Sequence, residues 1–270
     1  MSFSQFMLDV PPILRLLLAI LITVTVTVIC VHVFHSHILR INTAPKKAND
    51  DDPDPPPGVK DISGRLIALA TFAFVFLLGF AFSQFWSTAK DGRDAVQSEA
   101  VHYQRAVGLA QQLPDAQSAT VLKALEDYRQ SVVEVEWPLL VQADSSALIR
   151  ARYDSGGALA QAILEVLPSD AGSSPVWSNL ESSIDDLLDD ADDRTNAIPS
   201  QMAVSIIILV VVLGLVNLIA IALFQPSTKR ANLAVIASMA ALTGFLLFAV
   251  VEISNPYTGA GAITPELVQP

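Results

Sequence analysis

Four long apolar runs limit what this chain can fold into, because each is long enough to cross a bilayer as a helix. They occupy residues 12–34, 64–86, 201–224 and 231–251. A span of about 20 mostly apolar residues covers the roughly 30 Å hydrocarbon layer. The first run is preceded by Asp9 rather than by Lys or Arg, and no A-x-A site follows it, so we interpret it as a retained anchor and not as a cleaved signal peptide. The sequence therefore predicts a membrane protein with four spans in two hairpins.

The segments between the runs differ sharply in composition. Residues 1–11 form an N-terminal tail, 35–63 a linker rich in Pro and Asp, 225–230 a basic turn and 252–270 a C-terminal tail. Residues 87–200 contain 19 Asp or Glu and 8 Lys or Arg, which accounts for the whole net charge of −11. Clustered basic residues are needed to bind nucleic acid, so this balance argues against a nucleic-acid partner. The expected partners are membrane lipids and other protein chains.

Apolar residues within 87–200 recur at spacings of three and four, which is typical of helices packed in a bundle. We expect about four helices, the first two separated at Pro114, the third from about 144 to 167 and the fourth from about 175 to 197. Pro138 is expected to close the second helix, and Gly156 and Gly157 to kink or break the third. The predicted fold class is thus an all-α membrane protein with an inserted helical bundle domain. The predicted inward stripes are Val96, Ala100, Tyr103, Val107 and Ala110; Val121, Leu125, Tyr128, Val132 and Val135; Leu148, Leu159, Ile163 and Val166; and Leu180, Ile184, Leu187, Leu188 and Ala191.

Two groups of residues could be mistaken for metal sites. His32, His35 and His37 are close in sequence, but no carboxylate or thiol pattern completes a ligand set around them. The fourth bundle helix has seven carboxylates, yet a continuous helix spreads them outward instead of converging them as a calcium loop does. We expect a solvated acidic face, no metal and no cofactor.

The spans contain few polar residues. Asn217 in the third span is expected to form a hydrogen bond with a neighbouring helix. Glu252 is expected to lie at the interface or to be paired. Small residues in the fourth span, including Ala240 and Gly244, predict close contact with another helix.

Lys and Arg residues give a weak indication of orientation. The two short connections hold seven of them, against four near the span ends on the other side. Basic residues near span ends favour the cytoplasm. The count therefore places both termini and residues 87–200 outside the cytoplasm.

Four residue clusters follow the spans and recur in a fixed order. They are Glu99-Ala100, Glu136-Trp137-Pro138, Arg194 with Pro199, and Asn255-Pro256-Tyr257-Thr258-Gly259. Together with the layout of two plus two spans, they resemble the bestrophin-like family of bacterial integral membrane proteins of unknown function. The similarity covers roughly residues 64–260, although Asn255 and Tyr257 stand where the family more often has an acid and Phe. Kinship with bestrophins would imply a homo-oligomeric anion channel of four-span subunits, with the large insert in the cytoplasm, opposite to the charge count.

The same residues have a simple physical interpretation as structural or interaction residues. Trp137 can anchor the end of a bundle. Glu99 and Glu136 can pair across the bundle with an arginine, for which Arg194, Arg105 and Arg129 are the candidates. No residue pattern typical of a nucleophile, a phosphate loop or a metal-ligand pair is present, so we expect no enzymatic activity.

Three functions fit these observations. The first is a non-catalytic accessory or scaffold subunit whose acidic domain mediates assembly with a partner or with itself. The second is a homo-oligomeric bestrophin-like ion channel or transport protein, for which a polar stripe along a span would be the sequence feature. The third is a sensor, which lacks any recognisable output domain.

Overall fold

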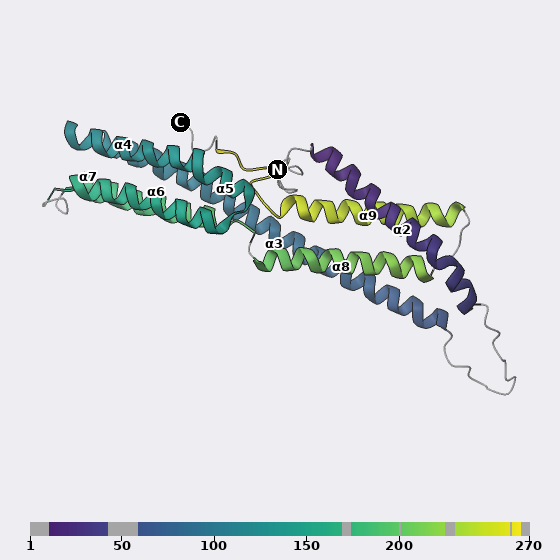
Figure 1. The fold of residues 1–270 in the computed structure, drawn as a ribbon. Helices are drawn as coiled ribbons and strands as arrows, with labels where there is room; N and C mark the ends of the chain where they lie inside the picture. The colour runs from purple at the N-terminus through teal and green to yellow at the C-terminus, as the bar shows by residue number, and fades with distance from the viewer. Residues whose placement is uncertain are drawn as a thin grey trace. The chain divides into compact units, whose positions relative to one another are not determined.

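The computed structural model describes residues 11–42, 59–168, 174–199, 201–224, 230–259 and 261–265 (Figure 1). Within these ranges the chain is helical and contains no strand, which confirms the predicted all-α class. The helices are α2 (Pro12–Asn42), α3 (Val59–Ala110), α4 (Asp115–Ser131), the π-helix η1 (Val132–Glu136), α5 (Trp137–Gln142), α6 (Ser145–Val166), α7 (Pro175–Asn196), α8 (Gln201–Phe224) and α9 (Arg230–Ile253).

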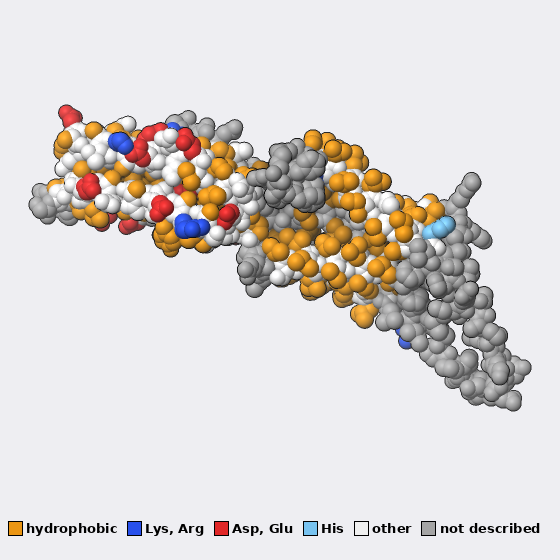
Figure 2. All heavy atoms as spheres, in the orientation of Figure 1, with side chains coloured by type: hydrophobic (Ala, Val, Ile, Leu, Met, Phe, Trp, Pro, Cys, Tyr) orange, Lys and Arg blue, Asp and Glu red, His pale blue; other side chains and the backbone are white. Residues whose placement is uncertain are grey.

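Four of these helices contain a segment long and apolar enough to cross a membrane, as predicted. The segments lie within Ile13–His32 of α2, Ile67–Ala110 of α3, Val204–Ile221 of α8 and Leu233–Ile253 of α9. Figure 2 shows dense apolar side chains over this part of the molecule. Exposed Leu, Ile, Val and Phe side chains on these helices are what a lipid environment requires.

The contacts divide the chain into two units. Unit 1 comprises residues 1–84 and 201–252, and unit 2 comprises residues 85–200 and 253–270. The residues after α9 therefore group with the acidic block, whereas the sequence predicts a separate C-terminal tail. Helix α3 passes from unit 1 into unit 2 as one continuous helix, because its single glycines and the absence of proline leave the backbone hydrogen bonds uninterrupted.

Unit 1 is held by small-residue and polar contacts between helices. A Cβ built on Gly244 of α9 would lie 3.2 Å from the carbonyl oxygen of Ala19 in α2, so Gly244 permits the predicted close approach. Asn217 of α8 accepts a 3.3 Å hydrogen bond from Thr71 of α3, which confirms its predicted bonding to a neighbouring helix. Glu252 pairs with Arg15 at 3.3 Å, as expected for a charge at the end of a span.

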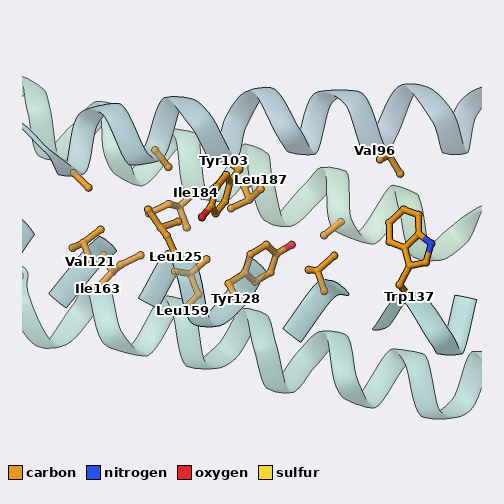
Figure 3. Close-up of a cluster of buried hydrophobic side chains, with 14 of the residues drawn as sticks. Val96, Tyr103, Val121, Leu125, Tyr128, Trp137, Leu159, Ile163, Ile184 and Leu187 are labelled. Carbon is orange, nitrogen blue, oxygen red and sulfur yellow. The ribbon is translucent and has the colours of Figure 1, made fainter. Parts of the chain in front are cut away.

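Unit 2 has one continuous apolar core formed by its helices (Figure 3). Two predicted interruptions do not occur. Helix α6 continues through Gly156 and Gly157, since Asp144 caps its N-terminus and the apolar stripe on both sides of the glycines is buried. Pro138 does not end a helix either: it is exposed, and the chain stays helical through η1 and α5 until Ala143 adopts a left-handed conformation with φ 54°.

Gly92 of α3 lies where segments of unit 2 approach each other closely. A Cβ at this position would lie 2.8 Å from the Cβ of Ala197 and 3.3 Å from the hydroxyl of Tyr257. We expect Gly92→Ala to destabilise the protein by about 1–3 kcal/mol, because the neighbouring backbone must move to relieve the overlap. Gly108→Ala on the same helix meets no atom within 4 Å and should be neutral or stabilising by up to about 1 kcal/mol. Thermal unfolding of the two variants in detergent checks this contrast; equal unfolding temperatures would contradict it.

Candidate functional site

Three charged residues, one on each of three elements, lie inside the core of unit 2: Glu99, Glu136 and Arg194. None of them has any measurable exposure to solvent. Burial of ionised groups is costly unless they are paired and hydrogen-bonded. Their placement therefore requires an explanation from the local helix geometry.

Glu99 reaches the core because the inward stripe of α3 differs by one residue from the predicted one. Val96, Glu99, Tyr103 and Ala106 are buried, whereas Ala100 and Val107, which were predicted to point inward, are only partly buried. Spacings of three and four both keep residues on one helix face, so the apolar pattern alone allowed either choice. The buried face of α3 thus includes the carboxylate of Glu99, whereas the apolar pattern predicted that the adjacent Ala100 would point inward.

Glu136 reaches the core because of the π-helix η1. The backbone N–H of Trp137 bonds to the carbonyl of Val132, five residues earlier, instead of four. This wider turn shifts the helix face by one residue, so Val135 is 48% exposed and Glu136 takes the inward position. The prediction that Val135 points inward was therefore wrong. The π-turn also lets the helix continue through Pro138, which has no N–H to donate.

Arg194 continues the apolar stripe of α7. It lies three residues after Ala191 and seven after Leu187, and all three are fully buried. The seven acids of α7 lie on its other faces, and five of them are exposed: Glu181, Asp185, Asp189, Asp192 and Asp193. Helix α7 thus has one buried cation, Arg194, near its C-terminal end, while its outer surface is strongly acidic.

Arg194 bridges both glutamates with short ion pairs. Its Nε donates to Oε2 of Glu99 at 2.6 Å, and its Nη2 donates to Oε2 of Glu136 at 2.7 Å and to Oε1 of Glu99 at 3.3 Å. Of the three arginines considered from sequence, Arg194 is the one that pairs with these carboxylates; Arg129 pairs with exposed Glu126 instead. Charge-assisted hydrogen bonds of this kind are stronger than neutral ones.

Neutral side chains add further hydrogen bonds to these three residues. Tyr128 donates to Oε1 of Glu99 at 2.8 Å, and Ser155 donates to Oε1 of Glu136 at 2.6 Å. Tyr257, from the segment after α9, donates to the carbonyl oxygen of Arg194 at 2.7 Å. We call the six residues Glu99, Tyr128, Glu136, Ser155, Arg194 and Tyr257 the buried charge network.

The aromatic ring of Trp137 closes one side of the network. The guanidinium carbon of Arg194 lies 5.9 Å from the ring centroid, within range of a cation–π interaction. Trp137 also contacts Tyr257 edge to face, with ring centroids 5.7 Å apart. Nη1 of Arg194 is buried and has no hydrogen-bond partner.

Burial and the neighbouring charges shift the pKa values of Arg194, Tyr128 and Tyr257 in ways that fix their protonation states. Burial lowers the pKa of Arg194 by itself, but the charges of Glu99 and Glu136 raise it well above its usual value, so the guanidinium stays charged. Burial, and then the charge of Glu99, raise the pKa of Tyr128 well above its usual value. Burial likewise raises the pKa of Tyr257 far above its usual value. Both phenols therefore remain hydrogen-bond donors at all physiological pH values.

A second polar contact joins α3 to α7 nearer the surface. Nδ1 of His102 and Oδ2 of Asp190 lie 2.6 Å apart. Burial raises the pKa of Asp190, although the hydrogen bond to His102 lowers it. Beside this pair, Asp91, Asp94 and Asp193 line a shallow groove of about 530 Å³. Among the described residues, no group of three His, Cys, Asp or Glu side chains has the spacing of a metal site; the side chains of His35 and His37 lie outside the described residues.

The C-terminal motif predicted from sequence folds onto unit 2. Asn255 donates to the carbonyl oxygen of Leu140 at 3.4 Å and accepts from the backbone N–H of Tyr257 at 3.0 Å. The carbonyl of Pro256 accepts from Ile263 at 2.9 Å, and Gly259 adopts a positive φ of 87°, a conformation that favours glycine. These turns place Tyr257 against Arg194 and Trp137. Asn217, in unit 1, and Pro199, after α7, are not part of the buried charge network.

Sequence reasoning missed Ser155 and did not place Tyr128 beside a charge. A signal for Ser155 was present, because 148, 152, 155 and 159 follow the same spacing of three and four as the apolar residues of α6. Arg152 is another member of this row; it donates to the carbonyl of Leu188 and pairs with Asp192 at 3.1 Å. Polar residues at positions where the helix spacing predicts a buried apolar residue could therefore have indicated the buried charge network from the sequence.

The chain is similar to a known protein family. A family model described as the Bestrophin-like domain matches residues 28–267, most of the chain. No curated protein and no solved structure matches the chain significantly. The matched range includes every residue of the buried charge network.

Proposed function

Because the chain belongs to the bestrophin-like family, we propose that it is a non-catalytic integral membrane protein whose acidic helical domain mediates assembly. It would act as an accessory or scaffold subunit, joined to a partner protein or to copies of itself. Family membership and four membrane-capable helices support the membrane setting. The assembly role is supported by the surface of unit 2.

The observation behind the assembly role is that unit 2 leaves large apolar side chains uncovered. These side chains belong to a segment rich in charge, so lipid contact does not account for them. Uncovered apolar residues that gather on one face mark protein interaction sites. Three such residues share one face of α6, since they are separated by four and eleven positions. Their exposures range from 48% to 74%, and they are Ile149, Tyr153 and Leu164.

The buried charge network supports the same role by fixing the surface behind it. Arg194 joins α3 to the η1 segment through two carboxylates, and Tyr257 adds the C-terminal segment. A buried polar network with its members paired specifies one arrangement of the helices. The outer faces of those helices are then held in a constant geometry suited to docking.

The protein's native mass tests this function. We expect the wild-type chain, extracted in mild detergent at native expression, to run as an oligomer or with a stoichiometric partner. Native mass spectrometry and identification of co-purified chains provide the readout. A monomer that retains no partner would contradict the assembly role.

We further propose that the chain lies in a bacterial inner membrane with residues 87–200 outside the cytoplasm. The excess of Lys and Arg in the short connections supports this orientation. Added protease should cleave residues 87–200 in spheroplasts without lysis; protection until lysis would reverse the orientation.

Ion conduction by a homo-oligomer is the alternative function, and membership in the family fits it as well. Asn217 does not favour it, because its amide contacts Thr71 within the helix packing. Purified protein in liposomes should show no voltage-driven flux of chloride or cations if the chain is a scaffold only. Reproducible flux would establish the alternative.

A further inference from the structure

A groove of about 330 Å³ lies between α4 and α6 in unit 2. Its apolar lining consists of small side chains, Ala124, Ala158 and Ala162, together with Leu159. Sites for small molecules combine such apolar walls with a few polar groups, and their volumes begin at about 300 Å³. The groove therefore has room for a small ligand.

Two members of the buried charge network, Tyr128 and Ser155, also line this groove. Tyr128 donates its hydroxyl proton to Glu99 at 2.8 Å, away from the groove. Ser155 donates its own to Glu136 at 2.6 Å. A hydroxyl group has a single proton and two lone pairs. In any contact with a ligand in the groove, these two oxygens can therefore only accept a hydrogen bond.

The charges directly behind the two hydroxyls are negative on balance. Glu99 and Glu136 have two negative charges, and Arg194 supplies a single positive charge to both of them. The nearby Arg152 does not change this balance, because it is paired with Asp192. The glutamates have no exposure to solvent, so their excess charge is weakly screened by water. The interior behind the groove therefore favours a cation.

Two carboxylates on the sides of the groove, Asp127 and Asp154, add further acceptors. Asp127 pairs with Lys123 on the same helix, an exposed contact that is weak in water. The Nε of Arg150, one turn before Asp154, donates to a backbone carbonyl of α6. Ionised carboxylates accept hydrogen bonds and donate none. The polar lining is thus dominated by acceptors, with the hydroxyl of Ser131 left to donate.

We propose that the groove between α4 and α6 binds a small organic ammonium ion, a protonated primary amine with a short apolar chain. The ammonium group has three donors and no acceptor, which matches this lining. Its apolar chain packs against the alanines and Leu159. A bare metal ion does not fit, because among the described residues no three carboxylate or imidazole side chains converge on one point. The site does not depend on the proposed assembly function.

The binding of n-butylammonium to the full chain in detergent tests the proposal. We expect a saturable rise in the unfolding temperature, because a ligand that binds only the folded chain stabilises it as the ligand concentration exceeds the dissociation constant. At the same concentration and ionic strength, n-butanol lacks the charge and butyrate has the opposite one, so neither should cause a saturable rise. A rise with all three probes, or with none, would contradict the proposal.

Two substitutions test the position of the site. Ala158→Leu fills the groove without changing its charge, and Asp154→Asn removes one charge; both residues are exposed, so the fold should persist. Each should raise the dissociation constant of n-butylammonium by at least about tenfold. The matched controls are Ala119→Leu, at an exposed position of α4, and Asp189→Asn, on the exposed face of α7, which should leave it unchanged.

Three further outcomes would overturn the site or its occupant. An equal loss of affinity in Asp189→Asn would mean that the whole acidic surface attracts the amine. Competition by ammonium chloride or magnesium chloride at the same concentration would make an inorganic cation the occupant. A peptide with a single lysine that binds more tightly than n-butylammonium would assign the groove to a side chain of a partner protein. The native mass of the complex judges the assembly function separately.

Discussion

Arg194→Met is expected to destabilise the protein by about 3–5 kcal/mol, because it leaves two buried carboxylates without their cation. Glu99 and Glu136 have no exposure to solvent and receive their ion pairs from Arg194. Methionine fills much of the same volume, so the loss reflects charge and not an empty cavity. Loss of helical circular dichroism on heating, followed in detergent, provides the measurement.

Two companion variants make this result specific. Arg129→Met removes a surface arginine that pairs with exposed Glu126 on the same helix, and should cost at most about 1 kcal/mol. Adding Glu99→Gln and Glu136→Gln to Arg194→Met should recover part of the loss, since no buried charge then lacks a partner. If Arg194→Met unfolds at the wild-type temperature, the three charges do not stabilise the core as the distances imply.

Trp137→Ala is expected to cost about 3–5 kcal/mol. The side chain is 6% exposed, contacts Tyr257 edge to face and covers the guanidinium of Arg194. Truncation leaves a large cavity and removes the cation–π contact in a single step. The same thermal measurement applies.

Val135→Ala is the matched control for the tryptophan. Val135 was predicted to point inward, but it is 48% exposed because η1 rotates the face of the helix. Its truncation should change the stability by no more than about 0.5 kcal/mol. A loss as large as that of Trp137→Ala would mean that the helix lacks the π-turn and that Val135 lies in the core.

Much of the helical framework was predictable because it depends on local chemistry. Apolar length identified the four spans, and the spacing of Leu180, Ile184 and Leu187 identified α7. Pro114 lies between α3 and α4 as expected, because proline lacks the N–H of a helical hydrogen bond and favours a break in the helix. Pairing of Glu99 and Glu136 with an arginine was expected, and the structure selects Arg194.

Predictions failed where helix register was involved. Periodicity allowed Ala100 as readily as Glu99, and it gave no sign of the extra residue that η1 introduces. The continuity of α6 through its two glycines was also missed, because packing on both sides outweighs the low helix propensity of glycine.

The sequence by itself determined the membrane-spanning segments, the acidic block and the existence of its helices, since apolar length and periodicity are local properties of the chain. Only the tertiary structure decided that Glu99, Glu136 and Arg194 meet inside the core, and that Tyr257 from the C-terminal segment joins them. The physical reason is that a buried charge is tolerated only where its partners converge from other helices. That convergence depends on a one-residue shift in a π-turn, which no local pattern records.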